Sequence, residues 1–251
     1  MRHIFIGTSG WLYNDWMGRF YPEGIRGQAK LPFYTEHFST VEINGTFYHM
    51  PLQKTVQHWY EVTPEAFVFS IKMNRYATHT KHLMVDEATN ATIDQFYERV
   101  HPLRQKLGIV LVQLPPSMKV DLSRIENLAS RTRYNEEKWN CAFALALEFR
   151  HESWFTPEVY RVLRNWNIAN VINDSPNRWP ASREITATRA YLRFHGSRQL
   201  YKSRYTDDEL RAWSQFITEN CGGCEEVYGY FNNDYSAVAV DNARTLLGFV
   251  R

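Results

Sequence analysis

The sequence predicts an α/β fold of the TIM (β/α)8-barrel type, in which eight parallel strands alternate with outer helices. Eight short apolar, β-rich runs each end in a polar or glycine-containing cluster, and longer helical patterns fill most of the gaps between them. The length of 251 residues, with 44% hydrophobic residues, suits one such barrel. We therefore expect residues 1–251 to form a single domain.

The eight predicted strands can be read in order along the chain. In a barrel of this type the carboxyl ends of the strands carry the active site, so their endings supply the candidate functional residues. The strand runs are HIFIG, TVEIN, FVFSIK, GIVLVQL, FALALEFR, ANVIND, AYLRFHG and EVYGYFNND.

Helical spacing or helix start signals mark most of the gaps between these runs. The stretch 175–189 is polar and lacks a helical pattern, so one outer helix is expected to be absent between the sixth and seventh strands. Residues 74–90 are long for a strand-to-helix loop and are predicted to form a lid or short helix over the barrel mouth. The predicted helices cover 28–38, 53–62, 90–107, 121–134, 156–166, 206–220 and 236–248.

Composition limits the classes of function. The 29 basic and 27 acidic residues give a formal charge of +2, which argues against binding nucleic acid through overall charge. No secretory signal pattern precedes the first strand, and no apolar stretch approaches the ~20 residues that cross a bilayer. Three cysteines are not a disulfide framework. We expect a cytoplasmic protein with no membrane partner, and the sequence leaves the oligomeric state open.

Side-chain alternation along each strand separates residues that face the barrel lumen from those that face the helices. In the fifth strand, Leu145, Leu147 and Phe149 form one bulky face. Glu148 and Arg150 belong to the other face, so both are predicted to point into the lumen near its carboxyl end.

The same alternation places polar or charged side chains on the inner face of the second, third and seventh strands. Several of these strands therefore contribute charge at the end of the barrel where function is expected. The converging residues are Glu42, Asn44, Lys72, Glu148, Arg150, Arg193 and His195, with Gln113, Asp174, Asn232 and Asn233 near the rim.

Two carboxylates among several cations suggest a general acid and base whose pKa values are separated by their surroundings. On this interpretation Glu42, Glu148 and His195 are the catalytic residues. The same charges would equally form a buried ion-pair layer, because an unpaired charge inside a barrel costs several kcal/mol. The candidate substrate-binding residues are Asn44, Lys72, Arg75, Gln113, Arg150, Asp174, Arg193, Asn232 and Asn233, with the aromatic residues Trp11, Tyr48 and Trp154.

Cofactor and metal motifs are not found in the sequence. The turn from Gly7 to Gly10 has neither the phosphate-loop nor the dinucleotide pattern, and there is no HxH or HExxH pair. We therefore predict no cofactor and assign no metal ligand. A divalent metal held by His195 with Asp174, Glu148 and Glu42 stays open as an alternative.

The strand endings also match a known set of motifs in order. They are IGTSGWxYxxW, VEINGTFYHMP, FVFSIKMNRYATH, LVQLPPS, LEFRHESW, YLRFHG and YFNNDYSAVAVDNA. Over essentially the whole chain they resemble the YecE-like family, domain of unknown function 72. The resemblance implies a TIM barrel and supplies no biochemical function. By family-level analogy it also suggests kinship with endonuclease IV-like barrels, whose metal cluster needs more histidines at strand ends than this chain has.

Three functions are compatible with these residues. The first is an enzyme of hydrolase, lyase or isomerase type that acts on a small anionic or polyhydroxylated substrate by acid/base chemistry. The second is a nucleic-acid-binding or metal-dependent DNA-processing protein of endonuclease IV-like type, in which Trp11, Tyr48 and Trp154 stack on bases while Lys72 and Arg75 meet phosphates. The third is a non-catalytic binding protein whose inner charges are structural.

Overall fold

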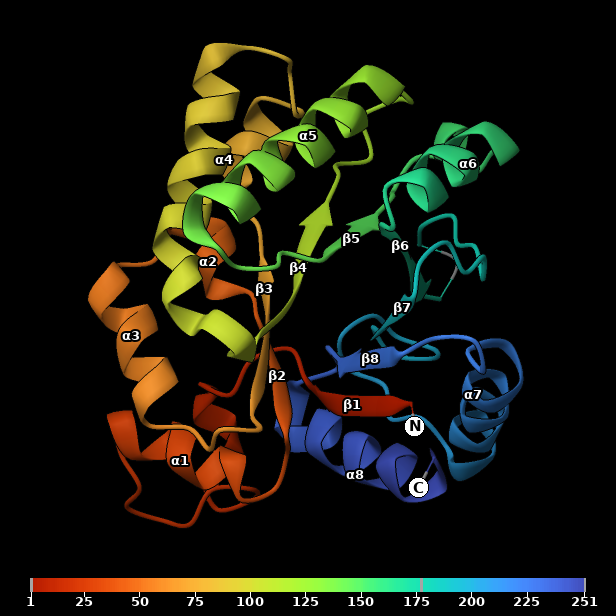
Figure 1. Cartoon of the computed structure of the whole chain (residues 1–251). Helices are drawn as coiled ribbons and strands as arrows, with labels where there is room; N and C mark the ends of the chain where they lie inside the picture. The colour runs from red at the N-terminus through yellow and green to blue at the C-terminus, as the bar shows by residue number, and fades with distance from the viewer. Residues whose placement is uncertain (1, 177, 251) are drawn as a thin grey trace.

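The computed structural model describes residues 2–176 and 178–250, and it shows eight parallel strands surrounded by helices (Figure 1). The hydrogen-bonded order is β1-β8-β7-β6-β5-β4-β3-β2, so sequence neighbours are also spatial neighbours. This order confirms the predicted TIM-type barrel. The strands are β1 (His3–Thr8), β2 (Thr40–Ile43), β3 (Val68–Lys72), β4 (Leu107–Gln113), β5 (Leu145–Glu148), β6 (Ala169–Asp174), β7 (Arg189–Phe194) and β8 (Glu226–Phe231).

The barrel closes at a seam between β1 and β2. A single parallel bridge pairs Ser9 with Glu42 there, just beyond the end of β1. Gly7 allows this close approach, because a Cβ at that position would collide with the backbone oxygen of Thr40. The hydroxyl of Tyr34 donates to the same Thr40 oxygen at 3.1 Å and supports the seam from outside. Glu42 is thus fixed at the point where the barrel closes.

Helices surround the strands, and they overlap each of the predicted helical segments. Side-chain caps explain several starts: Asp86, Thr156 and Thr206 each accept a backbone N–H in the first turn of the helix that follows. The helix predicted over 90–107 ends earlier than expected, because Pro102 lies just beyond its last residue. The outer helices are α1 (Lys30–Thr35), α3 (Gln53–Glu61), α4 (Glu87–Val100), α5 (Leu122–Trp139), α6 (Pro157–Asn165), α7 (Asp207–Asn220) and α8 (Val238–Val250).

The loops at the carboxyl ends of the strands carry the irregular parts of the fold. Residues 175–176 and 178–188, between β6 and β7, contain no helix, as the sequence predicts. A short helix that the sequence analysis did not predict, α2 (Gly45–Tyr48), follows β2 directly. A short π-helical turn, Tyr76–Thr80, follows β3 within the segment expected to hold a lid or short helix.

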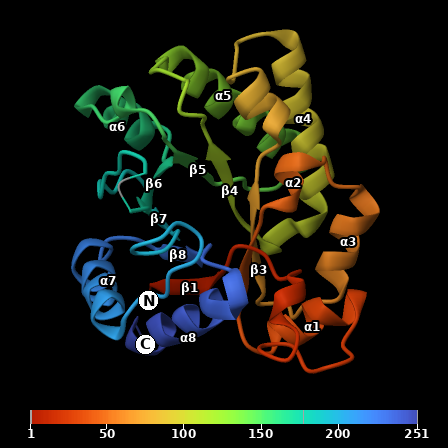
Figure 2. The same ribbon diagram turned by 180° about the vertical axis from the view of Figure 1, so that it is seen from behind.

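Two apolar clusters form the core. The larger one lies between the outer faces of the strands and the helices, which ring the barrel in both views (Figure 2). The smaller one fills the lumen and consists of Ile109, Leu111, Ala146, Ala169, Val171, Tyr191, Tyr228 and Tyr230. Its members alternate along their strands with members of the outer cluster, so the structure agrees with the parity predicted for β5 and β7.

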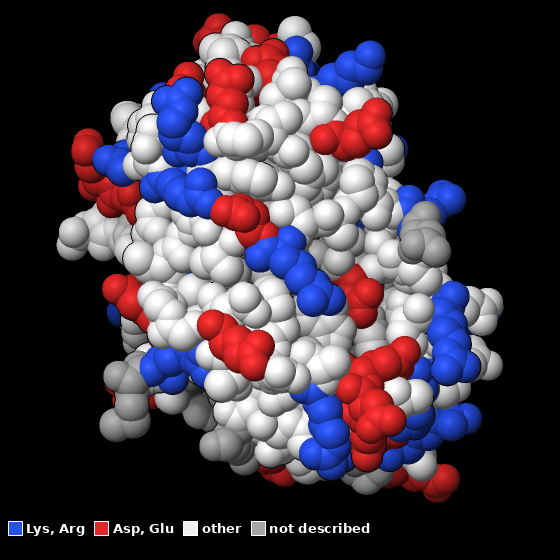
Figure 3. Space-filling model, turned by 90° about the vertical axis from the view of Figure 1, so that its right-hand side faces the viewer, with Lys and Arg blue, Asp and Glu red and all other residues white. Residues whose placement is uncertain are grey.

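The surface carries mixed charge. On the face shown in Figure 3, acidic and basic side chains are interspersed with uncharged ones, as expected from the nearly balanced composition. Within residues 2–176 and 178–250, no helix is both long enough and apolar enough to cross a membrane.

Candidate functional site

A layer of buried charges fills the carboxyl end of the lumen, and Arg193 at the end of β7 is its centre. The Arg193 Nε and Nη2 donate to the two oxygens of Glu42 at 2.9 and 2.7 Å. Its Nη1 donates to Glu148 Oε2 at 2.7 Å. All three side chains are at most 2% exposed. One guanidinium therefore joins carboxylates from β2 and β5 across the barrel.

Glu42 has all of its hydrogen-bonding capacity engaged. In addition to Arg193, Ser9 Oγ donates at 2.7 Å and Asn44 Nδ2 at 3.0 Å to Oε1, and the Tyr191 hydroxyl donates at 2.7 Å to Oε2. Burial alone would raise the pKa of Glu42, but attraction by Arg193 and these hydrogen bonds outweigh burial and lower it. Glu42 is thus an ionised carboxylate held in one position.

Glu148 lies between two guanidiniums. Arg150 donates to Oε1 and Arg193 to Oε2, and His195 Nε2 lies 3.6 Å from Oε1. Burial would raise the pKa of Glu148, but the two arginines outweigh it and hold the pKa well below its usual range. Both inner carboxylates are therefore charged at neutral pH.

His195 is a neutral imidazole. In this structure the amide nitrogen of Asn232 faces its Nδ1 at 3.2 Å, and in that amide orientation the ring proton is on Nε2. Complete burial lowers the pKa of His195 to about 4, although Glu148 opposes this shift. The imidazole thus presents a neutral N–H group at physiological pH.

Trp179 covers Arg150 and His195 from the loop between β6 and β7. The guanidinium carbon of Arg150 lies 3.3 Å from the centroid of the Trp179 ring, and the His195 ring lies 5.6 Å from it. Arg150 Nε and Nη1 and His195 Nε2 are buried and have no hydrogen-bond partner among the described residues. A buried donor without an acceptor costs about 1–3 kcal/mol, so the two nitrogens of Arg150 are left with unmet hydrogen-bonding capacity, as is His195 Nε2, which lies 3.6 Å from Glu148 Oε1.

Lys72 is the cation of the layer whose protonation is most easily changed. Its amine donates to Gln113 Oε1 and lies 4.2 Å from the centre of the Phe47 ring. Burial lowers the pKa of Lys72 to about 7, with repulsion by Arg193 contributing and the attraction of Glu148 opposing. The Lys72 amine therefore loses or gains its proton close to neutral pH.

Three residues predicted to bind substrate lie outside this layer. Asp174 faces α7, where it accepts from Trp213 Nε1 at 3.1 Å. Asn233 is buried and donates to Asn242 Oδ1 at 3.0 Å, which ties the end of β8 to α8. Trp154 is fully buried and donates its indole N–H to the backbone of the loop after β4. The placement of Asp174 and Asn233 corrects the expectation that they converge with the inner charges, and the buried ring of Trp154 does not lie at the rim as a stacking surface.

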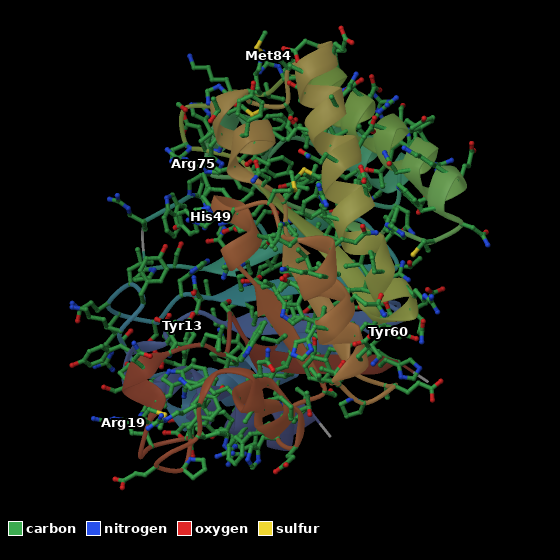
Figure 4. All side chains as sticks on the ribbon, turned by 90° about the vertical axis from the view of Figure 1, so that its left-hand side faces the viewer. Tyr13, Arg19, His49, Tyr60, Arg75 and Met84 are labelled. Atoms are coloured by element: carbon green, nitrogen blue, oxygen red, sulfur yellow. The ribbon has the colours of Figure 1, made fainter. Side chains whose placement is uncertain are left out.

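The remaining predicted residues lie at the rim. Tyr48 is 68% exposed, and Arg75 is exposed at the end of the loop after β3. Figure 4 shows Arg75 on the same side of the molecule as His49 and Tyr13. Trp11 is buried, and its ring packs edge-on against Trp59 at 5.9 Å.

The first loop is ring-rich, as the sequence shows, but only part of it faces a cavity. Trp16, Phe20 and Tyr21 are buried in the outer core and close off this side of the barrel. Trp11 and Tyr13 instead line a cavity of about 470 Å³ next to the charged layer. Ser9 and Asn44 line this cavity and hydrogen-bond to Glu42 behind its wall. The predicted inner charges themselves form a packed cluster in which no side chain is more than 9% exposed.

The arrangement does not assemble the metal site left open by the sequence. Asp174 is directed away from the lumen, and Glu42 and Glu148 are both engaged by Arg193. Within the described part of the chain, no group of three or more His, Cys, Asp or Glu side chains is placed to hold a metal ion.

Solved structures with low sequence identity share the barrel. Endonuclease IV from Thermus thermophilus superposes with a TM-score of 0.53 at 10% identity, covering 99% of each chain. A D-psicose 3-epimerase superposes with a TM-score of 0.56 at 9% identity, covering 100% of this chain and 98% of that one. At these identities the likeness concerns the fold alone.

Other proteins are similar to this chain over nearly its whole length, in sequence, in fold or in both. UPF0759 protein YunF of Bacillus subtilis (strain 168) is 28% identical over 271 residues, which cover 97% of this chain and 93% of that protein. A DUF72 family protein from Thermotoga maritima MSB8 superposes with a TM-score of 0.84 at 30% identity, covering 98% of both chains. One from Enterococcus faecalis V583 gives 0.81 at 21% identity, covering 98% of this chain and 95% of that one. The family described as protein of unknown function DUF72 matches residues 5–251, and the chain belongs to that family.

Proposed function

We propose that the protein is an enzyme that binds a small anionic or polyhydroxylated molecule over the charged layer and acts on it by proton transfer. The observation that carries the proposal is the set of buried N–H groups on Arg150 and His195 that have no acceptor among the described residues. A carboxylate, phosphate or hydroxyl oxygen supplies such an acceptor, and a charged oxygen does so most strongly.

The balance of charge favours an anion. Glu42 and Glu148 balance Arg150 and Arg193, so a protonated Lys72 is the uncompensated charge of the layer. A ligand with one negative charge would neutralise it and favour its protonated form. Binding of an anion is therefore coupled to the Lys72 proton.

The proton-transfer role fits Lys72 better than the carboxylates. A catalytic acid or base works best when its pKa lies near the working pH, and Lys72 meets this condition with a pKa of about 7. Glu42 and Glu148 have lowered pKa values and are engaged by arginines, which suits positioning of Arg193 and Arg150. The neutral N–H of His195 is suited to stabilise an oxygen that gains negative charge.

The nucleic-acid alternative has less support. Of the three rings expected to stack on bases, Trp154 is buried in the core and Trp11 is buried beside Trp59, while Tyr48 alone is freely exposed. The likeness to endonuclease IV concerns the fold only. A non-catalytic binding protein would use the same donors without proton transfer. A proton transfer by Lys72 would therefore distinguish an enzyme from a binding protein.

Binding of inorganic phosphate, measured by titration calorimetry below the Lys72 pKa, tests the proposal. Arg150→Met should weaken binding by at least about tenfold, since hydrogen bonds to charged groups are worth ~1.5–3 kcal/mol. Arg161→Met, at an exposed position on α6, is the matched control and should bind as the unmodified protein does. Phosphate that fails to bind the unmodified protein, or that binds Arg150→Met equally well while both remain folded, would overturn the anion site.

A further inference from the structure

The cavity beside the charged layer has no charged wall. It holds about 470 Å³ between the loop after β1, the short helix α2 and the start of α3. None of its fifteen lining residues is Asp, Glu, Lys or Arg, and its largest side chains are Trp11, Tyr13 and Trp59. Its volume falls in the ~300–1,000 Å³ range of small-molecule sites. An apolar, aromatic chamber thus adjoins a layer made of ionised groups.

The cavity wall and the charged layer share side chains. Ser9 and Asn44 line the cavity and donate to the same oxygen of Glu42, at 2.7 and 3.0 Å. Thr46 also lines the cavity and donates to the backbone oxygen of Lys72 at 2.7 Å. The two compartments are therefore separated by single side chains and lie at the same mouth of the barrel, where Figure 4 shows Tyr13 and His49 on one side of the molecule.

Asn44 lines the cavity and carries a hydrogen-bond acceptor without a partner among the described residues. Its Nδ2 is committed to Glu42, which fixes the orientation of the amide. Its Oδ1 is buried and has no partner among the described residues. A ligand that enters the cavity and carries an N–H or O–H group would satisfy this oxygen.

We propose that this cavity is the second half of the substrate site and that it takes a planar aromatic group carrying an N–H or O–H donor. This inference rests on the proposed function, because the anionic part of the same molecule would meet Arg150 and His195. Trp11 and Trp59 meet at 86° and give the chamber flat walls at right angles. Leu12 and Leu52 line its opening and are 62% and 57% exposed, so an apolar ligand would remove them from water.

The test uses indole and 1-methylindole, which differ in the ring N–H donor. We expect indole to bind about fivefold more tightly, the difference made by one hydrogen bond of ~1 kcal/mol. Thr55→Trp, which fills the cavity from α3, should weaken indole binding at least about tenfold, the ratio that ~1.4 kcal/mol of binding free energy produces. Gln57→Trp places the same ring on the same helix outside the cavity lining and should leave indole binding unchanged. Thr55→Leu fills the cavity less and serves if the tryptophan variant fails to fold.

Phosphate separates this inference from the proposed function. Thr55→Trp should bind phosphate with unchanged affinity, and indole and phosphate should bind the unmodified protein together. Equal affinity for the two indoles, or unchanged indole binding in both Thr55 variants, overturns the aromatic subsite and leaves the anion site standing. Competition between indole and phosphate overturns the division into two compartments. If the unmodified protein does not bind phosphate, the proposed function is overturned, whether or not indole binds.

Discussion

At its amino end the barrel lumen is filled by apolar and aromatic side chains, and at its carboxyl end by ionised ones. Ile109, Val171 and Tyr228 in the first half and Arg193 and Glu148 in the second are all at most 2% exposed. Burial of apolar groups stabilises the fold, whereas each buried charge costs free energy that its partners must offset. Equal burial therefore has opposite thermodynamic consequences in the two halves, and the costly half lies where barrels of this type carry their active sites.

Tyrosines form the boundary between the halves. The rings of Tyr191 and Tyr230 pack together with centroids 5.4 Å apart, and Tyr191 directs its hydroxyl to Glu42. The Tyr230 hydroxyl bonds to Thr40 at 2.6 Å and to Ser70 at 2.9 Å. Each tyrosine thus presents an apolar ring to one half and a hydrogen-bonding group to the polar groups at the other.

The largest expected effect comes from removing the cation that joins the two carboxylates. Arg193→Met leaves Glu42 without its guanidinium and Glu148 with Arg150 alone. Removing one partner of a buried ion pair lowers the unfolding free energy by about 3–5 kcal/mol. Urea unfolding measured by circular dichroism checks this value.

A second substitution shows whether charge is the cause. Adding Glu42→Gln to Arg193→Met removes the carboxylate left without a guanidinium, so the double variant should be more stable than Arg193→Met alone. A loss below about 1 kcal/mol for Arg193→Met would show that the layer is not held by its ion pairs.

Replacing Lys72 should raise the unfolding free energy, opposite to the loss expected for Arg193→Met, and the size of the gain should depend on pH. Its folded pKa of about 7 lies below the ordinary ~10.4, so between these values the unfolded chain binds more protons and stability rises with pH. Below the folded pKa the full cost of the buried ammonium is present. Lys72→Met should therefore stabilise the protein there, by about 2–4 kcal/mol, and progressively less as pH rises.

Thermal unfolding at a series of pH values measures the Lys72 effect. Lys119→Met, at an exposed position after β4, is the control and should change stability little at any pH. A stability gain in Lys72→Met that does not shrink as pH rises would contradict the lowered pKa. Phosphate affinity should fall in this variant below the Lys72 pKa, because the uncompensated cation is gone.

Much of the contrast between the apolar and the charged half of the lumen can be predicted from the sequence, because the geometry of a strand fixes the alternation of its side chains. The alternation predicts that Leu147 and Glu148 lie on opposite faces of β5, and the structure confirms this. In β6 the alternation does not decide which face is inner, because each face of the run ANVIND carries at least one apolar residue and an asparagine; the structure places Val171 in the lumen and Asp174 against α7.

Other features could not be read from the sequence. Trp179 lies in a loop without periodicity, and its stacking on Arg150 depends on the path of residues 178–188 through space. The lowered pKa of Lys72 depends first on its burial and then on repulsion by Arg193, which is remote in sequence and is brought near by closure of the barrel. The burial of Trp154 likewise depends on the loop after β4, whose Met118 oxygen accepts its N–H.

The smallest expected effect tests whether the two halves are independent. Ile109→Val removes one methylene group from the apolar half, where Ile109 is fully buried in the lumen. It should cost about 1 kcal/mol of unfolding free energy. The cost should be the same below and above the Lys72 pKa, because no titrating group is changed, and phosphate affinity should stay that of the unmodified protein. Urea unfolding at two pH values and phosphate calorimetry measure both. If the loss of unfolding free energy varied with pH, or if phosphate affinity changed, packing in the apolar half would have to position the charges at the carboxyl end. The two halves would then act as one unit.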